Sequence, residues 1–285
     1  MDFSLSASDA YQRARRGVDN MYLRVRSFVR PYLRERICFL HLEKCGGTSV
    51  RSAIERAQMH WKRWKRPEVR VGAHASIAAA RRLGRPSYAF REHILYYQLA
   101  RDDVPFVTGH VQLDKELIEA HRTKWRFVTL LREPVQRWIS YYFFNRYKAP
   151  STDFNRIDEP LEAFLDTPDG WFRGQDYVRL LTSDGDRLFQ NGSGREGMPS
   201  DEQINDAKRT LDAFDVAGVL EDVPGFVDRF DERFGVRLKM SRKRTSPASR
   251  SQRERQLSPE VRQKIRKICR PNMAVYEHLR DTLAG

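Results

Sequence analysis

The sequence predicts an α/β fold in which a central parallel sheet is flanked by helices. Short apolar segments with the composition of buried strands alternate along the chain with segments of helical periodicity, a pattern typical of parallel α/β proteins. The 285 residues suffice for one large domain, and a hydrophobic fraction of 40% supplies its core. The chain contains no apolar run long enough to cross a membrane, and it begins without the pattern of a secretory signal.

The individual elements are predicted in chain order from their composition and from helix-start residues. Short apolar segments bounded by charged or turn residues predict strands at 36–42, 105–110, 125–131 and 214–220. Apolar spacing predicts helices at 48–58, 76–83, 90–99, 134–147, 160–166, 175–182, 202–213 and 223–234. Pro134 suits the first turn of its helix. Ser258 and Pro259 begin a last helix, which Pro271 interrupts, whereas the basic stretch 241–256 has no periodicity.

Residues 1–35 are predicted to form a basic amphipathic helix ahead of the main domain at 36–285. Apolar side chains such as Tyr11, Val18 and Val25 recur at helical spacing, and arginines fill the other faces. Such a helix can pack on its own domain, pair with a second copy of the chain, or lie on a membrane surface. The sequence leaves these alternatives open.

The charge balance indicates an anionic ligand. Lysine and arginine together number 52 against 38 acidic residues, which gives a net charge of +14, and most of the cations are arginine. Arginine suits the bidentate recognition of phosphate, sulfate and carboxylate, although a compositional bias of the genome would produce the same excess. The three cysteines match neither a disulfide framework nor a zinc site, which favours a reducing, cytoplasmic compartment.

A glycine-bearing turn is predicted between the first strand and the helix that follows it. The segment from Phe39 to Ser49 reads Phe-Leu-His-Leu-Glu-Lys-Cys-Gly-Gly-Thr-Ser. The N–H groups at a helix N-terminus bind anions, and Gly46 and Gly47 let the backbone approach one closely. Lys44 adds a positive charge beside them. Because this lysine precedes the glycines, the turn differs from the nucleoside triphosphate loop GxxxxGK[ST].

Two further motifs make the pattern more specific. Arg132 ends a predicted strand, and Ser140 follows eight residues later, nearly two turns into the helix that begins at Pro134. Val-Thr-Gly-His, ending at His110, lies between this motif and the turn. In this order the three segments resemble the sulfotransferases that use 3′-phosphoadenosine 5′-phosphosulfate (PAPS). The resemblance spans roughly residues 36–282. The Gly-His element is similar to that of carbohydrate enzymes, in particular the branch that sulfates the 2-O position of uronic acids in heparan sulfate.

The resemblance implies a P-loop-like three-layer fold and a role for each motif. It implies that Lys44 stabilises the leaving phosphate and that His110 is the general base, with His74 as the second candidate. The residues implied to hold PAPS are Lys44, Cys45, Gly46, Gly47, Thr48 and Ser49 at the 5′ end, Arg132 and Ser140 at the 3′ phosphate, and Arg242 and Lys243 in a closing loop. The sulfuryl group passes to a hydroxyl of a glycan or similar acceptor, an acidic sugar being one candidate, and no metal is implied.

Two residues depart from the family pattern. Glu43 stands where the family usually has proline, and Cys45 stands where it usually has threonine. An acidic side chain beside a dianion costs energy unless it points away, and Cys45 lacks a hydroxyl that could bond the phosphosulfate.

Two other functions are alternatives at this point. A P-loop kinase or phosphotransferase would use ATP and magnesium, but no acidic strand end of the Walker B kind is evident to hold the metal. A basic protein that binds nucleic acid or membrane through its N-terminal helix would bind with a steep salt dependence. No nucleic-acid motif supports that second alternative, so we expect no nucleic-acid partner.

Overall fold

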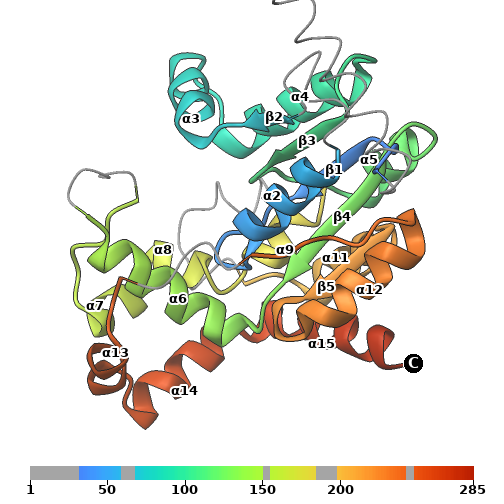
Figure 1. The fold of residues 1–285 in the computed structure, drawn as a ribbon. Coiled ribbons are helices and arrows are strands. Elements are labelled where there is room, and N and C mark those ends of the chain that lie inside the picture. The colour runs from blue at the N-terminus through green and yellow to red at the C-terminus, as the bar shows by residue number, and fades with distance from the viewer. Residues whose placement is uncertain (1–31, 59–67, 150–154, 184–197, 242–246) are drawn as a thin grey trace, which may run out of the picture.

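The computed structural model describes residues 32–58, 68–149, 155–183, 198–241 and 247–285. They form an α/β fold around a five-stranded sheet with the strand order β2-β3-β1-β4-β5 (Figure 1). The strands are β1 (Ile37–Leu40), β2 (Glu68–Val71), β3 (Phe106–Gly109), β4 (Arg126–Leu131) and β5 (Val216–Val219). Every neighbouring pair is parallel. The predicted fold class is therefore confirmed.

Helices cover both faces of this sheet. Their bounds are α2 (Gly47–Ala57), α3 (Ala73–Arg82), α4 (Ser87–Ala100), α5 (Lys115–His121), α6 (Pro134–Tyr147), α7 (Leu161–Leu165), α8 (Pro168–Phe172), α9 (Asp176–Leu180), α11 (Asp201–Asp212), α12 (Val223–Phe234), α13 (Arg250–Gln256), α14 (Pro259–Ile268) and α15 (Arg270–Ala284), with a short 3₁₀ turn at Leu220–Asp222. The helices predicted at 134–147 and 223–234 match in full, and the break near Pro271 falls between α14 and α15.

The alternation of side chains along β1 builds the three layers. Ile37 and Phe39 point into one apolar cluster, in which residues of α2 and α12 pack. Cys38 and Leu40 point into the opposite cluster, where α4, α5, α9, α11 and α15 contribute their apolar faces. Because both faces of the central strand are covered, its four residues are all buried.

Several elements were not predicted from the sequence. β2 is an edge strand in which only Val71 is buried, and its Glu-Val-Arg-Val alternation lies in a segment too basic to suggest a strand. α5 and α8 are single short helices. The stretch 241–256, which has no apolar periodicity, contains α13. This helix begins with a capping box: the Ser249 hydroxyl accepts from the Gln252 N–H, and the Gln252 side chain accepts from the Ser249 N–H.

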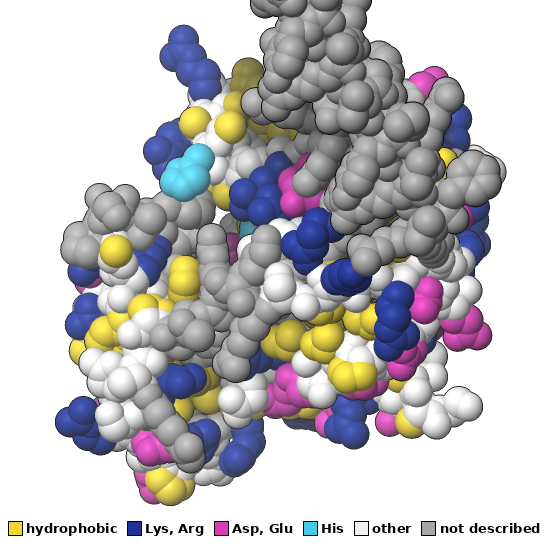
Figure 2. All heavy atoms as spheres, viewed as in Figure 1, with side chains coloured by type: hydrophobic (Ala, Val, Ile, Leu, Met, Phe, Trp, Pro, Cys, Tyr) yellow, Lys and Arg dark blue, Asp and Glu magenta, His cyan; other side chains and the backbone are white. Residues whose placement is uncertain are grey.

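Some predictions lie outside the described residues. They are the main part of the N-terminal helix (1–31) and the basic loop with Arg242 and Lys243. None of the described helices is both long and apolar enough to span a membrane. Lysine and arginine side chains are spread over the visible face of the molecule (Figure 2), as the net charge of +14 leads one to expect.

The topology gives the carboxyl ends of the strands a special position. From β1 the chain passes to the outer strand β2 and returns through β3, and then it crosses to β4 and β5 on the other side of β1. The connections after β1 and β4 therefore leave the sheet in opposite directions. In parallel α/β sheets, ligands bind at the carboxyl ends of the strands where the strand order reverses.

Candidate functional site

The loop after β1 has the backbone geometry of an anion-binding turn. Lys44 and Gly46 both adopt left-handed conformations, with φ of 64° and 75°, and Gly46 is the N-cap of α2. A left-handed lysine costs about 1 kcal/mol, which the surrounding contacts must offset. The first N–H groups of α2 have no partner within the helix and stand at its positive end. The predicted turn is thus formed by residues 43–49, the segment we call the β1 turn.

The second glycine of the β1 turn is required by a neighbouring ring. A Cβ atom on Gly47 would lie 2.0 Å from the His41 ring, well inside van der Waals contact. His41 therefore packs directly on the start of α2. The His41 ring thus braces the start of the helix that follows the β1 turn.

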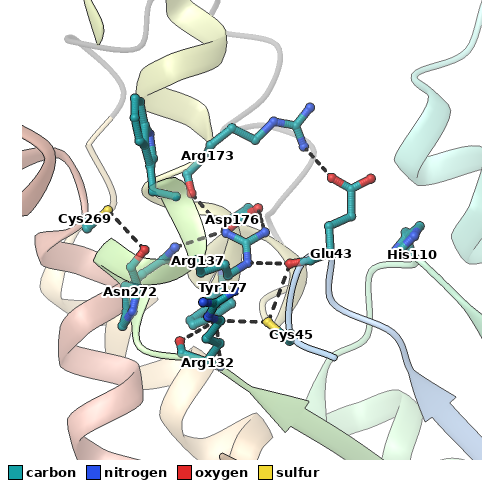
Figure 3. Close-up of polar contacts among 12 residues, drawn as sticks. Glu43, Cys45, His110, Arg132, Arg137, Arg173, Asp176, Tyr177, Cys269 and Asn272 are labelled. Carbon is teal, nitrogen blue, oxygen red and sulfur yellow. Dashed lines mark hydrogen bonds and ion pairs between the residues drawn. The ribbon is translucent and has the colours of Figure 1, made fainter. Parts of the chain in front are cut away.

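Two arginines hold the carbonyl groups of the β1 turn. The Nε of Arg137 donates to the Glu43 carbonyl oxygen at 2.8 Å (Figure 3). A guanidinium N–H of Arg132 donates to the Lys44 carbonyl oxygen at 3.3 Å. Arg132 is thus adjacent to the turn. Its contact with the turn is an addition to the phosphate role that the sequence predicted.

One stripe of α6 faces the β1 turn. The Lys44 Nζ lies 3.5 Å from the centre of the Phe144 ring, a cation–π contact. Phe144 is one turn beyond Ser140 and two turns beyond Arg137, so the three share a face of the helix. The predicted residue Ser140 consequently lies on the face of α6 that Lys44 contacts.

His110 directly follows β3 and lies next to His41. Its Nδ1 is hydrogen-bonded to the His41 carbonyl oxygen, and the two imidazole rings are 4.6 Å apart. A carbonyl only accepts, so Nδ1 carries the proton and Nε2 has a free lone pair. Burial lowers the pKa of His110, while Glu43 and the His41 carbonyl act in the opposite direction. His110 is therefore neutral at pH 7 and able to accept a proton.

An ion pair balances the negative charge of Glu43. Its carboxylate lies 3.3 Å from the guanidinium of Arg173, which is 9% exposed and also pairs with Asp169 (Figure 3). Burial acts to raise the pKa of the Glu43 carboxyl, but the nearby cations, first Arg173, outweigh it and the pKa is lowered. The acidic residue that departs from the family pattern is thus ionised and held toward α8.

The thiol of Cys45 points into the protein. Cys45 is fully buried, with its Sγ 3.2 Å from the hydroxyl of Tyr177, and burial raises its pKa. Its side chain therefore faces away from any ligand of the β1 turn, and its backbone N–H is the group left for the predicted binding role. Thr48 and Ser49 are half-buried in the first turn of α2, whereas His74 is exposed on α3.

The structure brings the predicted residues of three separate motifs together at the carboxyl ends of the strands. It also adds residues that the sequence did not single out for this site, namely Arg91, Arg137, Asp176 and Tyr177. Arg91 donates to the His110 carbonyl oxygen at 3.2 Å and is 4% exposed. The spacing of Arg137 and Ser140 on α6 was a signal that could have identified Arg137. Arg91 and Tyr177 lie far from the motifs in sequence, and no local signal marks them.

Comparisons with known proteins give a structural likeness at low identity. The chain matches no protein-family model, and a search of curated proteins finds no match. Among solved structures it is similar to a sulfotransferase from Alicyclobacillus acidocaldarius. The two are 15% identical, the match covers 86% of this chain and 95% of that one, and the TM-score is 0.45. The similarity is one of overall chain path, at an identity too low to transfer residue roles.

Proposed function

We propose that this protein is a sulfotransferase that moves a sulfuryl group from PAPS to a hydroxyl of a carbohydrate acceptor. The observation that carries the proposal is the convergence of the β1 turn, Arg132 and His110 at the carboxyl ends of β1, β4 and β3. A positively charged site for an anion and a neutral imidazole with a free Nε2 then lie together at the carboxyl ends of the strands.

The residues at this end of the strands fit a nucleotide with an anionic group at each end. The β1 turn offers the N-terminal N–H groups of α2, the hydroxyls of Thr48 and Ser49, and the Lys44 ammonium to the 5′ end. Arg132 and Ser140 are the groups for a 3′ phosphate. The contact of Arg132 with the Lys44 carbonyl keeps the two sets of groups adjacent.

In the proposed mechanism one residue removes the proton of the acceptor hydroxyl and another stabilises the negative charge of the leaving phosphate. PAPS supplies a sulfuryl group joined to its 5′ phosphate through a bridging oxygen. His110 takes the acceptor's hydroxyl proton on Nε2 while the hydroxyl oxygen bonds to sulfur. Lys44 stabilises the electron pair that the breaking sulfur–oxygen bond leaves on the phosphate. Lys44 reaches that position by leaving the ring of Phe144, a contact worth about 0.5–1 kcal/mol at a solvated site.

A polyhydroxylated acceptor suits the groups around His110. The carboxylate of Glu43 accepts hydrogen bonds, and the guanidinium of Arg173, with which it pairs, donates them. Sugar hydroxyls both donate and accept, so they match this mixed set better than a purely apolar acceptor does. The net charge of +14 also favours an acidic glycan over a neutral one through long-range attraction.

The test is transfer of radiolabelled sulfate from PAPS to a panel of neutral and acidic glycans. We expect Lys44→Ala to lower kcat by about 10²–10³-fold, the usual effect of removing one charge-stabilising donor. Lys115→Ala is the matched control, because Lys115 is half-exposed on α5 and, in the part of the chain that the structure describes, forms its ion pair with the exposed Glu119. Full activity of Lys44→Ala, or no transfer from PAPS to any acceptor in the panel, would contradict the proposal.

A binding experiment separates this function from that of an ATP-dependent phosphotransferase. We expect adenosine 3′,5′-bisphosphate to raise the Tm of the protein without added metal, and ATP with magnesium to raise it less. A larger shift with ATP and magnesium would favour the phosphotransferase.

A further inference from the structure

The hydroxyl of Tyr177, on α9, lies between the two segments proposed to hold the nucleotide. It donates to the Arg132 carbonyl oxygen at 2.7 Å and accepts from the Arg132 N–H at 3.0 Å. It is also 3.2 Å from the Sγ of Cys45 in the β1 turn. Because the phenolic proton is committed to a carbonyl, a hydrogen bond between the two groups has the thiol as its donor, and the same thiol also has the Glu43 carbonyl oxygen as an acceptor at 3.6 Å. One oxygen atom thus touches both the β1 turn and the residue that follows β4.

Tyr177 is itself held rigidly by a buried polar network. Its N–H donates to the Asn272 side chain at 2.9 Å, and Asn272 donates to Asp176 at 3.1 Å. Asp176 forms a two-pronged ion pair with Arg137, whose Nε reaches the Glu43 carbonyl oxygen. The members Arg137, Asp176, Tyr177 and Asn272 are all 2% exposed or less. The hydroxyl therefore occupies a fixed point relative to α6 and α15.

The protonation states keep this arrangement in place across ordinary pH. Burial raises the pKa of the Tyr177 phenol well above its usual value, and burial likewise raises the pKa of the Cys45 thiol. Both groups stay neutral near pH 7. The neutral thiol then contacts the phenol and the Glu43 carbonyl oxygen as a weak hydrogen-bonding group and is not a nucleophile.

We propose that Tyr177 is a positioning residue that sets the spacing between the β1 turn and Arg132, so that the two ends of one nucleotide are bound cooperatively. This inference rests on the proposed function. A ligand with an anion at each end needs both segments at the correct separation. A ligand with one anion needs only one segment and is insensitive to that separation.

The test compares three nucleotides by titration calorimetry: adenosine 3′,5′-bisphosphate, adenosine 5′-monophosphate and adenosine 3′-monophosphate. In Tyr177→Phe we expect the Kd of the bisphosphate to rise about tenfold, the usual effect of losing one well-placed buried hydrogen bond. The Kd of each monophosphate should change less than about twofold. Tyr142→Phe is the matched control, since Tyr142 is also buried but its hydroxyl donates to the Glu159 carbonyl away from the site.

Each result has a distinct meaning. Equal weakening of all three nucleotides, or unchanged bisphosphate binding, overturns the role of Tyr177 and leaves the proposed function standing. A wild-type protein that binds the bisphosphate no better than the monophosphates overturns the proposed function, and this inference with it. Should Tyr177→Phe fail to fold, Cys45→Ala removes the other half of the contact, and selective weakening of the bisphosphate by about threefold is then expected.

Discussion

Nδ1 of His110 is bonded to the backbone carbonyl of His41, so the imidazole of one strand end is fixed by the backbone of the neighbouring strand end. β1 and β3 are adjacent in the sheet, and the bond spans their carboxyl termini. It selects the tautomer with a free Nε2 and keeps the ring beside the β1 turn. The orientation of the proposed base thus depends on the register of two strands and not on a neighbouring carboxylate.

The first prediction concerns the pH dependence of sulfate transfer. Burial lowers the pKa of His110, so the fraction of neutral imidazole and with it kcat/KM should rise with pH through a midpoint below the ordinary value of about 6.5. His110→Ala should lower kcat by about 10²–10⁴-fold and abolish this acid limb. The control is His74→Ala, which should keep both, because His74 is exposed on α3. A pH profile that follows His74 instead would reverse the assignment of the base.

The second prediction concerns the glycines that begin two helices. Gly47→Ala should lower the free energy of unfolding by about 1–3 kcal/mol, because its Cβ would meet the His41 ring at 2.0 Å. Gly72→Ala at the N-cap of α3 should change it by less than about 0.5 kcal/mol, since nothing lies within 4 Å of that Cβ and φ is −75°. Urea denaturation of both variants measures the difference, and equal stability would refute the packing of His41 on α2.

The third prediction concerns the buried ion pair between Arg137 and Asp176. Arg137→Ala leaves Asp176 charged and buried and removes the donor to the Glu43 carbonyl oxygen, so we expect a loss of about 3–5 kcal/mol in the free energy of unfolding. Arg209→Ala is the control, because Arg209 and its partner Asp206 are 55% and 41% exposed. That variant should change stability by less than about 1 kcal/mol. Similar urea midpoints for the two variants would contradict the prediction.

The fourth prediction concerns Glu68, which pairs with Arg51 across β2 and α2. Burial, together with a hydrogen bond to Glu55, raises the pKa of Glu68 from 4.5 to about 7. Between these values the folded protein holds a proton that the unfolded chain has released, so stability falls as pH rises through this window.

Glu68→Gln removes that titration. Relative to wild type, the variant should gain on the order of 1 kcal/mol in the free energy of unfolding between pH 5 and pH 8, a figure reduced for partial solvent exposure. Urea titrations of both proteins at the two pH values provide the measurement. A difference that is independent of pH, or that runs in the opposite direction, would show that Glu68 has an ordinary pKa in the fold.

Local sequence patterns predicted most of the sheet and the site motifs. β1 and β3 are buried throughout, and β4 and β5 are buried at all but one residue, so each is a short apolar run that stands out from charged neighbours. The β1 turn and the Arg132 motif were also recognisable, because strand, turn and helix start are contiguous in each. β2 escaped because an edge strand with one buried residue has no such contrast.

The residues that connect the motifs could not be predicted in the same way. Tyr177 reaches Cys45 and Arg132 across 132 and 45 positions of sequence. Arg173 neutralises Glu43 across 130 positions. Such contacts depend on how α8 and α9 pack beside the loops that follow β1 and β4. A single sequence gives no spacing rule for them. The sequence alone suggested that Glu43 would repel an anion, because it does not reveal that Arg173 pairs with this residue.

The reversal of strand order at β1 divides the chain into two exchangeable parts. Residues 68–110 form one uninterrupted stretch that carries β2, α3, α4 and β3 and ends at His110. The groups proposed to face the nucleotide belong to the β1 turn and to the segments that follow β4. A graft of this stretch from a related protein would therefore replace the side chains that residues 68–110 place around His110, while Glu43 and the groups proposed for the nucleotide stay unchanged. Under the proposed function, such a graft should alter acceptor preference more than nucleotide affinity.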